Sequence, residues 1–283
     1  MKKKLVSTAI VLAIIILVAL RFFYPVRLIV RGDDMGLCHE ASTGCLHAHQ
    51  EGILTCVEVM VPAPGFLEAA RMLHETTDLD IGIHLTLTCE WESIHWAPLT
   101  CAPSLTDSTT GAMYARIWPD PDYPQLTPLS AVGWNYREVE DELRAQIETG
   151  LRHLPRCSHL TPHMTFPVLS PAIRHLCVRL AREYGLTANL RLLPVRQVEL
   201  TGDQSDTESA VRFAVGQLQH LNLGIYEIFT HPMFFPGNEI PEYYSSDTCD
   251  FKWRMTDAHV LMSRQVRDII NQKHIQLTGY SGL

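Results

Sequence analysis

The chain has 283 residues, of which 46% are hydrophobic and 19% are charged. This length and composition indicate a globular domain with a sizeable core, and they exclude a disordered or fibrous chain. The net charge of −8, with no Lys/Arg cluster beyond the first four residues, excludes a typical nucleic-acid-binding protein. The 14 His and 8 Cys are residue types that bind metals, so the composition raises the question of a metal site.

Residues 1–25 have the pattern of a membrane segment. Lys2–Lys4 precede an uncharged apolar run over residues 5–20, and Arg21 and an aromatic stretch follow. The pattern predicts a signal anchor, an uncleaved transmembrane helix with its Lys end in the cytoplasm. The alternative is a cleaved signal peptide and a secreted protein, although no convincing cleavage site is present. Either interpretation places the rest of the chain outside the cytoplasm.

An extracytoplasmic location permits disulfide bonds. None of the eight Cys forms a C-x-x-C pair, so the sequence gives no support to a structural zinc knuckle. Cys89 and Cys101 flank one loop-like segment and are candidates for a disulfide. Most of the other Cys lie in apolar runs, where Cys behaves as a small buried hydrophobic residue.

Strand-like and helix-like segments alternate from residue 26 onward. Short apolar or alternating runs predict strands at 26–30, 53–61, 80–88, 157–161, 187–193, 225–230 and 275–278. Helical periodicity and end signals predict helices at 39–51, 64–75, 135–153, 171–184, 206–221 and 256–271. Residues 89–134 are rich in Pro and Trp and predict a long insertion. About seven βα units in one direction indicate a parallel, barrel-like α/β domain.

Polar residues recur where these predicted strands end. The first strand ends at Asp33-Asp34, the third carries His84, the fourth leads to His163, and the sixth ends at His231. In parallel α/β folds these ends meet at one rim, which is where catalytic groups gather. One Asp with two His suits a divalent metal with open positions for water and substrate, and leaves an Asp and a His as base and acid. Each residue alone also has an ordinary structural interpretation, as a turn, a helix cap or a core His.

Five blocks in this order resemble those of the YdjC/ChbG (HpnK-type) carbohydrate deacetylase family. They are LIVRGDDMGLCHEAS, DIGIHLTLT, SHLTPHMTF, YEIFTHPMF and FKWRMTDAHVL. The resemblance implies a distorted (β/α) barrel of about seven parallel strands over residues 26–283. It implies hydrolysis of N-acetyl groups from amino sugars in oligosaccharides or glycans. Together with the anchor predicted at residues 1–25, it indicates a membrane-anchored, extracytoplasmic member of the family.

The resemblance also implies the roles of individual residues. Asp34, His84 and His163 correspond to the ligands of one divalent metal ion, expected to be Zn or Mg. Asp33 corresponds to the general base, and His231 to the general acid or oxyanion partner.

Other residues of the expected site have less defined roles. Arg254 is expected to orient the base or to contact substrate. Trp91 and Trp96 offer flat apolar faces for sugar rings; the alternative is that they anchor the insertion to the barrel.

The chain departs from the family pattern at several positions. Thr161 stands where many members have Asp, and Thr165 where many have His. Arg31-Gly32 replaces the more usual Asn-Ala. Loss of the Asp removes a carboxylate that would orient a metal-binding His. Two alternatives therefore remain: a membrane-tethered glycan-binding pseudoenzyme, and another metal-dependent hydrolase on the same barrel. The oligomeric state is not indicated by the sequence.

Overall fold

The computed structural model describes residues 25–188, 195–202 and 206–283. Within these ranges no helix is both long and apolar enough to cross a membrane. The predicted anchor at residues 1–25 lies outside the described residues, apart from Pro25.

The centre of the fold is a parallel β-sheet of eight strands. The strands are β1 (Val26–Met35), β2 (Cys56–Val59), β3 (Asp80–Leu85), β4 (His159–Pro162), β5 (Thr187–Ala188), β6 (Arg196–Gln197), β7 (Gly224–Thr230) and β8 (Gln276–Leu277). Their order is β5-β4-β3-β2-β1-β7-β6, and β8 pairs with the start of β1. Within the described residues, β5 and β6 do not pair with each other. The expected parallel α/β architecture is therefore confirmed, but the sheet is an open half-barrel.

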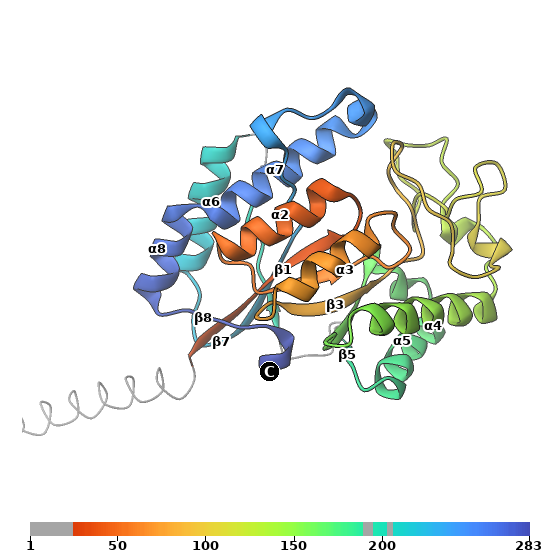
Figure 1. The fold of residues 1–283 in the computed structure, drawn as a ribbon, viewed down its shortest axis with the longest axis horizontal. Coiled ribbons are helices and arrows are strands. Elements are labelled where there is room, and N and C mark those ends of the chain that lie inside the picture. The colour runs from red at the N-terminus through yellow and green to blue at the C-terminus, as the bar shows by residue number, and fades with distance from the viewer. Residues whose placement is uncertain (1–24, 189–194, 203–205) are drawn as a thin grey trace, which may run out of the picture.

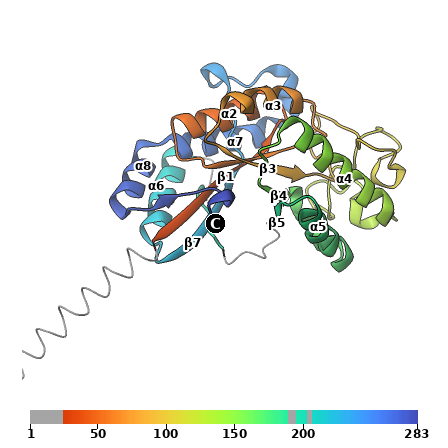
Figure 2. The ribbon, with the colours of Figure 1, turned by 60° about the horizontal axis from the view of Figure 1, so that its bottom comes forward.

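Helices cover the sheet (Figures 1 and 2). They are α2 (His39–Gln50), α3 (Phe66–Glu75), α4 (Tyr136–His153), α5 (Pro171–Glu183), α6 (Thr207–Gln219), α7 (Thr248–Met262) and α8 (Arg264–Lys273). Side chains cap three of them: Asn135 accepts from the N–H of Arg137 in α4, and Ser170 and Asp206 cap α5 and α6 in the same way. The single helix predicted at 256–271 is wrong, because Ser263 has extended backbone that separates α7 from α8.

The insertion at residues 89–134 is mostly irregular, as expected. It contains two 3₁₀ turns, Pro103–Leu105 and Leu129–Ala131, and one antiparallel bridge. Figure 1 shows it in yellow, beside α4. The disulfide considered for Cys89 and Cys101 is not formed, and all eight cysteines are free.

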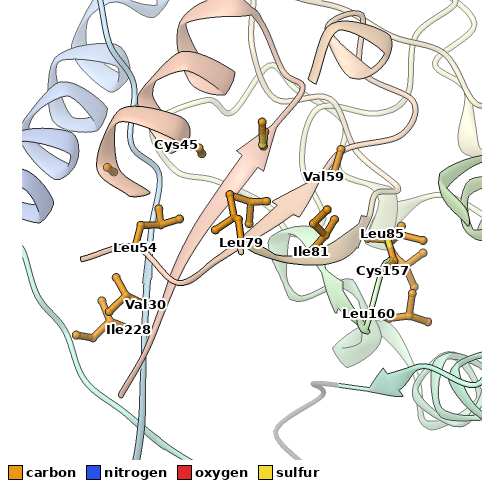
Figure 3. Packing of buried hydrophobic residues seen from close by; sticks show 14 of the residues in the cluster. Val30, Cys45, Leu54, Val59, Leu79, Ile81, Leu85, Cys157, Leu160 and Ile228 are labelled. Atoms are coloured by element: carbon orange, nitrogen blue, oxygen red, sulfur yellow. The ribbon is translucent and has the colours of Figure 1, made fainter. Parts of the chain in front are cut away.

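The main core lies between the strands and their helices. Figure 3 shows part of it, where Val30, Val59, Ile81, Leu160 and Ile228 come from five different strands. All five are essentially inaccessible to solvent. Burying a side chain of this size contributes about 1.5–3 kcal/mol relative to leaving it exposed. This core fixes the strand ends that carry the polar residues described next.

Candidate metal and catalytic site

The end of β1 is irregular, and this irregularity brings two adjacent carboxylates to one cavity. Gly32 pairs with Val57 of β2 but Met35 pairs with Val59, so β1 has one extra residue at this point. Such a bulge re-aims side chains. Asp34 has left-handed backbone with φ of 64°, a conformation that Asp tolerates better than most residues. As a result, Asp33 and Asp34 both line the same cavity.

Asp34, His84 and His163 meet at the carboxyl ends of β1, β3 and β4. Asp34 Oδ1 lies 3.4 Å from His84 Nε2 and 3.2 Å from His163 Nδ1, and the two imidazole nitrogens are 3.4 Å apart. Ligands at about 2.0–2.1 Å from a tetrahedral zinc ion are roughly 3.3–3.4 Å from one another. Asp34 Oδ1 is also buried without a hydrogen-bond partner. The three residues therefore fit a divalent cation.

The second oxygen of Asp34 is held by Arg254. Arg254 Nη1 donates to Asp34 Oδ2 at 2.8 Å, and Arg254 Nε donates to Asp250 Oδ2 at 2.7 Å. Burial raises the pKa of Asp34, but Arg254 and His163 outweigh it and hold this pKa well below its usual value. Asp34 is therefore an ionised carboxylate with one oxygen fixed by Arg254 and the other facing His84 and His163. Arg254 was expected to orient the base or to contact substrate; it contacts the candidate ligand Asp34 and lines the cavity beside it.

Each imidazole has a partner on its far nitrogen. His163 Nε2 donates to Glu90 Oε2 at 2.9 Å, and His84 Nδ1 lies 2.9 Å from Thr161 Oγ1. Partners of this kind fix the orientation and the tautomer of metal-binding His. Glu90 was not identified from the sequence, because it reaches His163 only through the path of the loop after β3.

The two imidazoles differ in charge when no cation is present. Burial and the neighbouring His163 lower the pKa of His84 to about 3. Burial also lowers the pKa of His163, but Glu90 and Asp34 outweigh it and raise this pKa to about 10. At neutral pH, His84 is neutral and His163 carries the proton that a bound cation would replace.

Asp33 stands beside this group and is held by Arg31. Arg31 Nε and Nη2 donate to the two oxygens of Asp33, each at 2.6 Å, and Nη1 donates to Glu227 at 2.9 Å. Asp33 Oδ2 is 3.8 Å from His84 Nε2. Residues two apart on a strand share a face, and this signal could have identified Arg31 as the partner of Asp33.

His231 completes the polar rim. Its Nε2 lies 4.0 Å from Asp34 Oδ2, and its backbone N–H donates to Asp257 at 2.8 Å. About a third of its side chain is exposed, more than any other member of the rim. Its place next to the carboxylates and open to the cavity suits a group that exchanges protons with a bound molecule.

The site opens into a cavity of about 480 Å³. Apolar side chains form part of its wall, including Phe229 and Val168, which are 48% and 59% exposed. Trp91 and Trp96 are almost fully buried and are not among the residues that line this cavity. The ring of Trp91 instead packs 5.0 Å from the guanidinium carbon of Arg254, and its Nε1 donates to Asp250. Trp91 thus packs against the site from outside its cavity, and the ring of Trp96 lies 5.6 Å from that of Trp91.

Fold and site together define a class of protein: a parallel α/β half-barrel with a buried Asp-His-His cluster at its carboxyl rim. Residues 27–272 match the family described as YdjC-like protein, and the chain belongs to this family. The family resemblance inferred from the five sequence blocks is thereby confirmed.

Several relatives carry the name carbohydrate deacetylase. The one from Brevibacillus brevis is 28% identical, with 91% of this chain and 99% of the relative covered. The one from Vibrio parahaemolyticus is 27% identical, with 91% and 96% covered. "Carbohydrate deacetylase 2" of Listeria innocua is 25% identical, with 90% and 97% covered.

Two solved structures share the fold. An Enterococcus faecalis protein, named for a proposed role in cellobiose-phosphate cleavage, superposes with a TM-score of 0.68 at 23% identity, covering 90% of this chain and 98% of that one. The catalytic domain of a peptidoglycan N-acetylglucosamine deacetylase from Eubacterium rectale gives 0.50 at 10% identity, covering 89% and 87%. At these identities the likeness establishes the fold alone.

Proposed function

We propose that this protein hydrolyses the N-acetyl group of amino sugars in oligosaccharides or glycans, using a divalent metal ion held by Asp34, His84 and His163. The observation that carries the proposal is the spacing of these three ligand atoms around the unpartnered oxygen of Asp34. The names of the relatives support the reaction class. Two imidazoles among the ligands favour Zn, Fe, Co or Mn over Mg.

The residues around the cation site fit amide hydrolysis. A bound divalent ion supplies Lewis acidity, which polarises a carbonyl oxygen and lowers the pKa of a water ligand toward about 7 in the case of zinc. Asp33, fixed by Arg31, accepts the proton of the attacking water. His231 donates a proton to the leaving amine as the amide C–N bond breaks. One water is consumed, and acetate and a free amine are formed.

The cavity wall suits a sugar ring. Phe229 borders the polar rim and presents about half of its surface to solvent, and this exposed part can pack against the C–H groups of a sugar. We therefore assign to Phe229 the stacking role that the sequence indicated for Trp91 and Trp96.

The membrane-anchored, extracytoplasmic location stays a proposal, and it rests on the sequence of residues 1–25. Fractionation of cells expressing the full chain tests it, combined with protease accessibility in intact cells. Recovery of the chain in the soluble cytoplasmic fraction would contradict it.

Acetate release from chito-oligosaccharides by the purified full chain tests the proposed activity. We expect release that a chelator abolishes and that added Zn²⁺ or Co²⁺ restores. A protein that binds these oligosaccharides but releases no acetate with any of these metals would instead be a glycan-binding pseudoenzyme.

A further inference from the structure

Thr161 lies inside a buried hydrogen-bond chain. Thr161 Oγ1 donates to Glu58 Oε2 at 2.5 Å and lies 2.9 Å from His84 Nδ1. Thr161 and Glu58 have no solvent exposure, and His84 has almost none. A carboxylate of β2 is therefore linked to an imidazole of β3 through a hydroxyl of β4.

The hydroxyl determines where the proton of His84 resides. Thr161 has one hydroxyl proton, and its hydrogen bond to Glu58 Oε2 uses that proton. With that proton directed to Glu58, Thr161 Oγ1 must accept from His84, so the imidazole proton is on Nδ1. His84 Nε2 is then unprotonated, and it is the atom that faces Asp34 Oδ1 and His163 Nδ1.

The sheet has an opening that allows Glu58 to reach across it. Gly82 of β3 is the register partner of Glu58 on one side and of His159 on the other. A Cβ atom at Gly82 would lie 2.2 Å from Glu58 Oε2 and 2.4 Å from His159 Nε2. The missing side chain thus leaves the space in which Glu58 crosses β3.

The carboxylate is held firmly at the end of this crossing. His159 Nε2 donates to Glu58 Oε1 at 2.7 Å, and Arg31 Nε lies 3.9 Å from the same oxygen. Contacts of this kind hold a buried carboxylate in one orientation. Both oxygens of Glu58 therefore have partners on β4: Oε1 accepts from His159, and Oε2 accepts from Thr161.

We propose that Glu58 and Thr161 are positioning residues for His84: Glu58 acts on the imidazole through the Thr161 hydroxyl, a relay that lies between them. The inference rests on the proposed function, in which His84 is a metal ligand. A carboxylate that acts through a neighbouring group on a metal-binding His fixes its tautomer and raises its basicity.

Zn²⁺ affinity of the full chain, measured by chelator competition, tests the relay. We expect Thr161→Val to weaken Zn²⁺ binding about 10–100-fold, the usual cost of removing such a partner. Thr161→Ser retains the hydroxyl and should bind as the wild type does. Glu58→Gln should weaken binding, and the double variant Glu58→Gln/Thr161→Asp should recover it, because a carboxylate is again next to His84 Nδ1.

Glu142→Gln is the matched control. Glu142 is also a fully buried carboxylate with several donors, among them Gln146 Nε2 at 2.8 Å, but it contacts none of the candidate ligands. It should lose stability without losing Zn²⁺ affinity. Unchanged Zn²⁺ binding in both Thr161→Val and Glu58→Gln would overturn the relay.

The tautomer of His84 in the metal-free protein gives a second measurement. Imidazole nitrogen chemical shifts should show the proton on Nδ1 in the wild type and a mixture of tautomers in Thr161→Val. A wild type with the proton on Nε2 would overturn the relay even if metal binds. If the wild type has the proton on Nδ1 but binds no Zn²⁺, the proposed function is contradicted. The conclusion that Glu58 and Thr161 set the tautomer of His84 would still hold.

Discussion

The guanidinium of Arg31 donates two parallel hydrogen bonds of 2.6 Å each to the carboxylate of Asp33. Paired bonds of this kind fix the plane of a carboxylate as well as its position. Glu227 in turn fixes Arg31, through a bond of 2.9 Å to Nη1. Asp33 is thus rigidly placed beside the candidate cation site without belonging to the three-ligand set.

This arrangement predicts that a change at Asp33 lowers activity without releasing the metal. Asp33→Asn should retain bound metal, because Asp34, His84 and His163 are intact. It should lower kcat by about 10²–10⁴-fold, the usual contribution of a positioned proton-transfer group. Metal content and acetate release measured on one preparation check both parts. Asp268→Asn, at an exposed surface position, serves as the control, and full activity in Asp33→Asn would exclude Asp33 as the base.

His84→Ala should behave differently from Asp33→Asn. The change removes His84 Nε2, one of the three candidate ligand atoms, so both bound metal and acetate release should be lost. His95→Ala changes an exposed His of the insertion and should alter neither. Metal analysis after dialysis checks the prediction. Retention of one equivalent of metal by His84→Ala would remove His84 from the ligand set.

Metal affinity should rise with pH. With the pKa of His163 raised to about 10, the metal-free site holds a proton on this residue at neutral pH, and the cation must displace it. Affinity should therefore increase about tenfold per pH unit below pH 10 and level off above it, once the proton is lost. Zn²⁺ competition titrations in a pH series, corrected for the chelator's own protonation, measure this slope. A flat profile between pH 6 and 9 would contradict a protonated His163.

Phe229→Ala should weaken substrate binding more than catalysis. If a sugar ring packs on Phe229, loss of the ring should raise KM roughly tenfold, about 1.4 kcal/mol, with a smaller change in kcat. Val168→Ala, a smaller apolar change on the same cavity wall, is the comparison. Trp91→Phe should instead act through its lost bond to Asp250, lowering the melting temperature with KM unchanged. An unchanged KM in Phe229→Ala would place the sugar elsewhere.

The sequence patterns predicted where the strands end, but they did not predict which side chains contact one another across the sheet. The alternation of strands and helices indicated that Asp34, His84 and His163 come together at one rim, and the structure brings them within hydrogen-bond range of each other. Helix ends with a capping residue, such as Asn135, were predicted well because the cap is a local interaction. The break at Ser263 was missed, since apolar periodicity continues through it.

The partners of the ligands could not be predicted in the same way. Glu90 depends on the path of an irregular loop, and Glu58 depends on strand register, which periodicity alone does not determine. For Trp91 and Trp96 the sequence left two alternatives, stacking on a sugar or anchoring the insertion, because it does not show the direction in which an aromatic side chain points. Their burial fits the second alternative.

The space above Gly82 has a consequence for how such sites change over evolutionary time. A glutamate at position 58 can reach position 161 only if position 82 has no side chain, so the three positions should vary together among homologues. Chains that carry the carboxylate directly on the fourth strand are free to place a larger residue at 82 or a small one at 58. A lineage could exchange one arrangement for the other without passing through a site that lacks the carboxylate, provided that the glycine appears first.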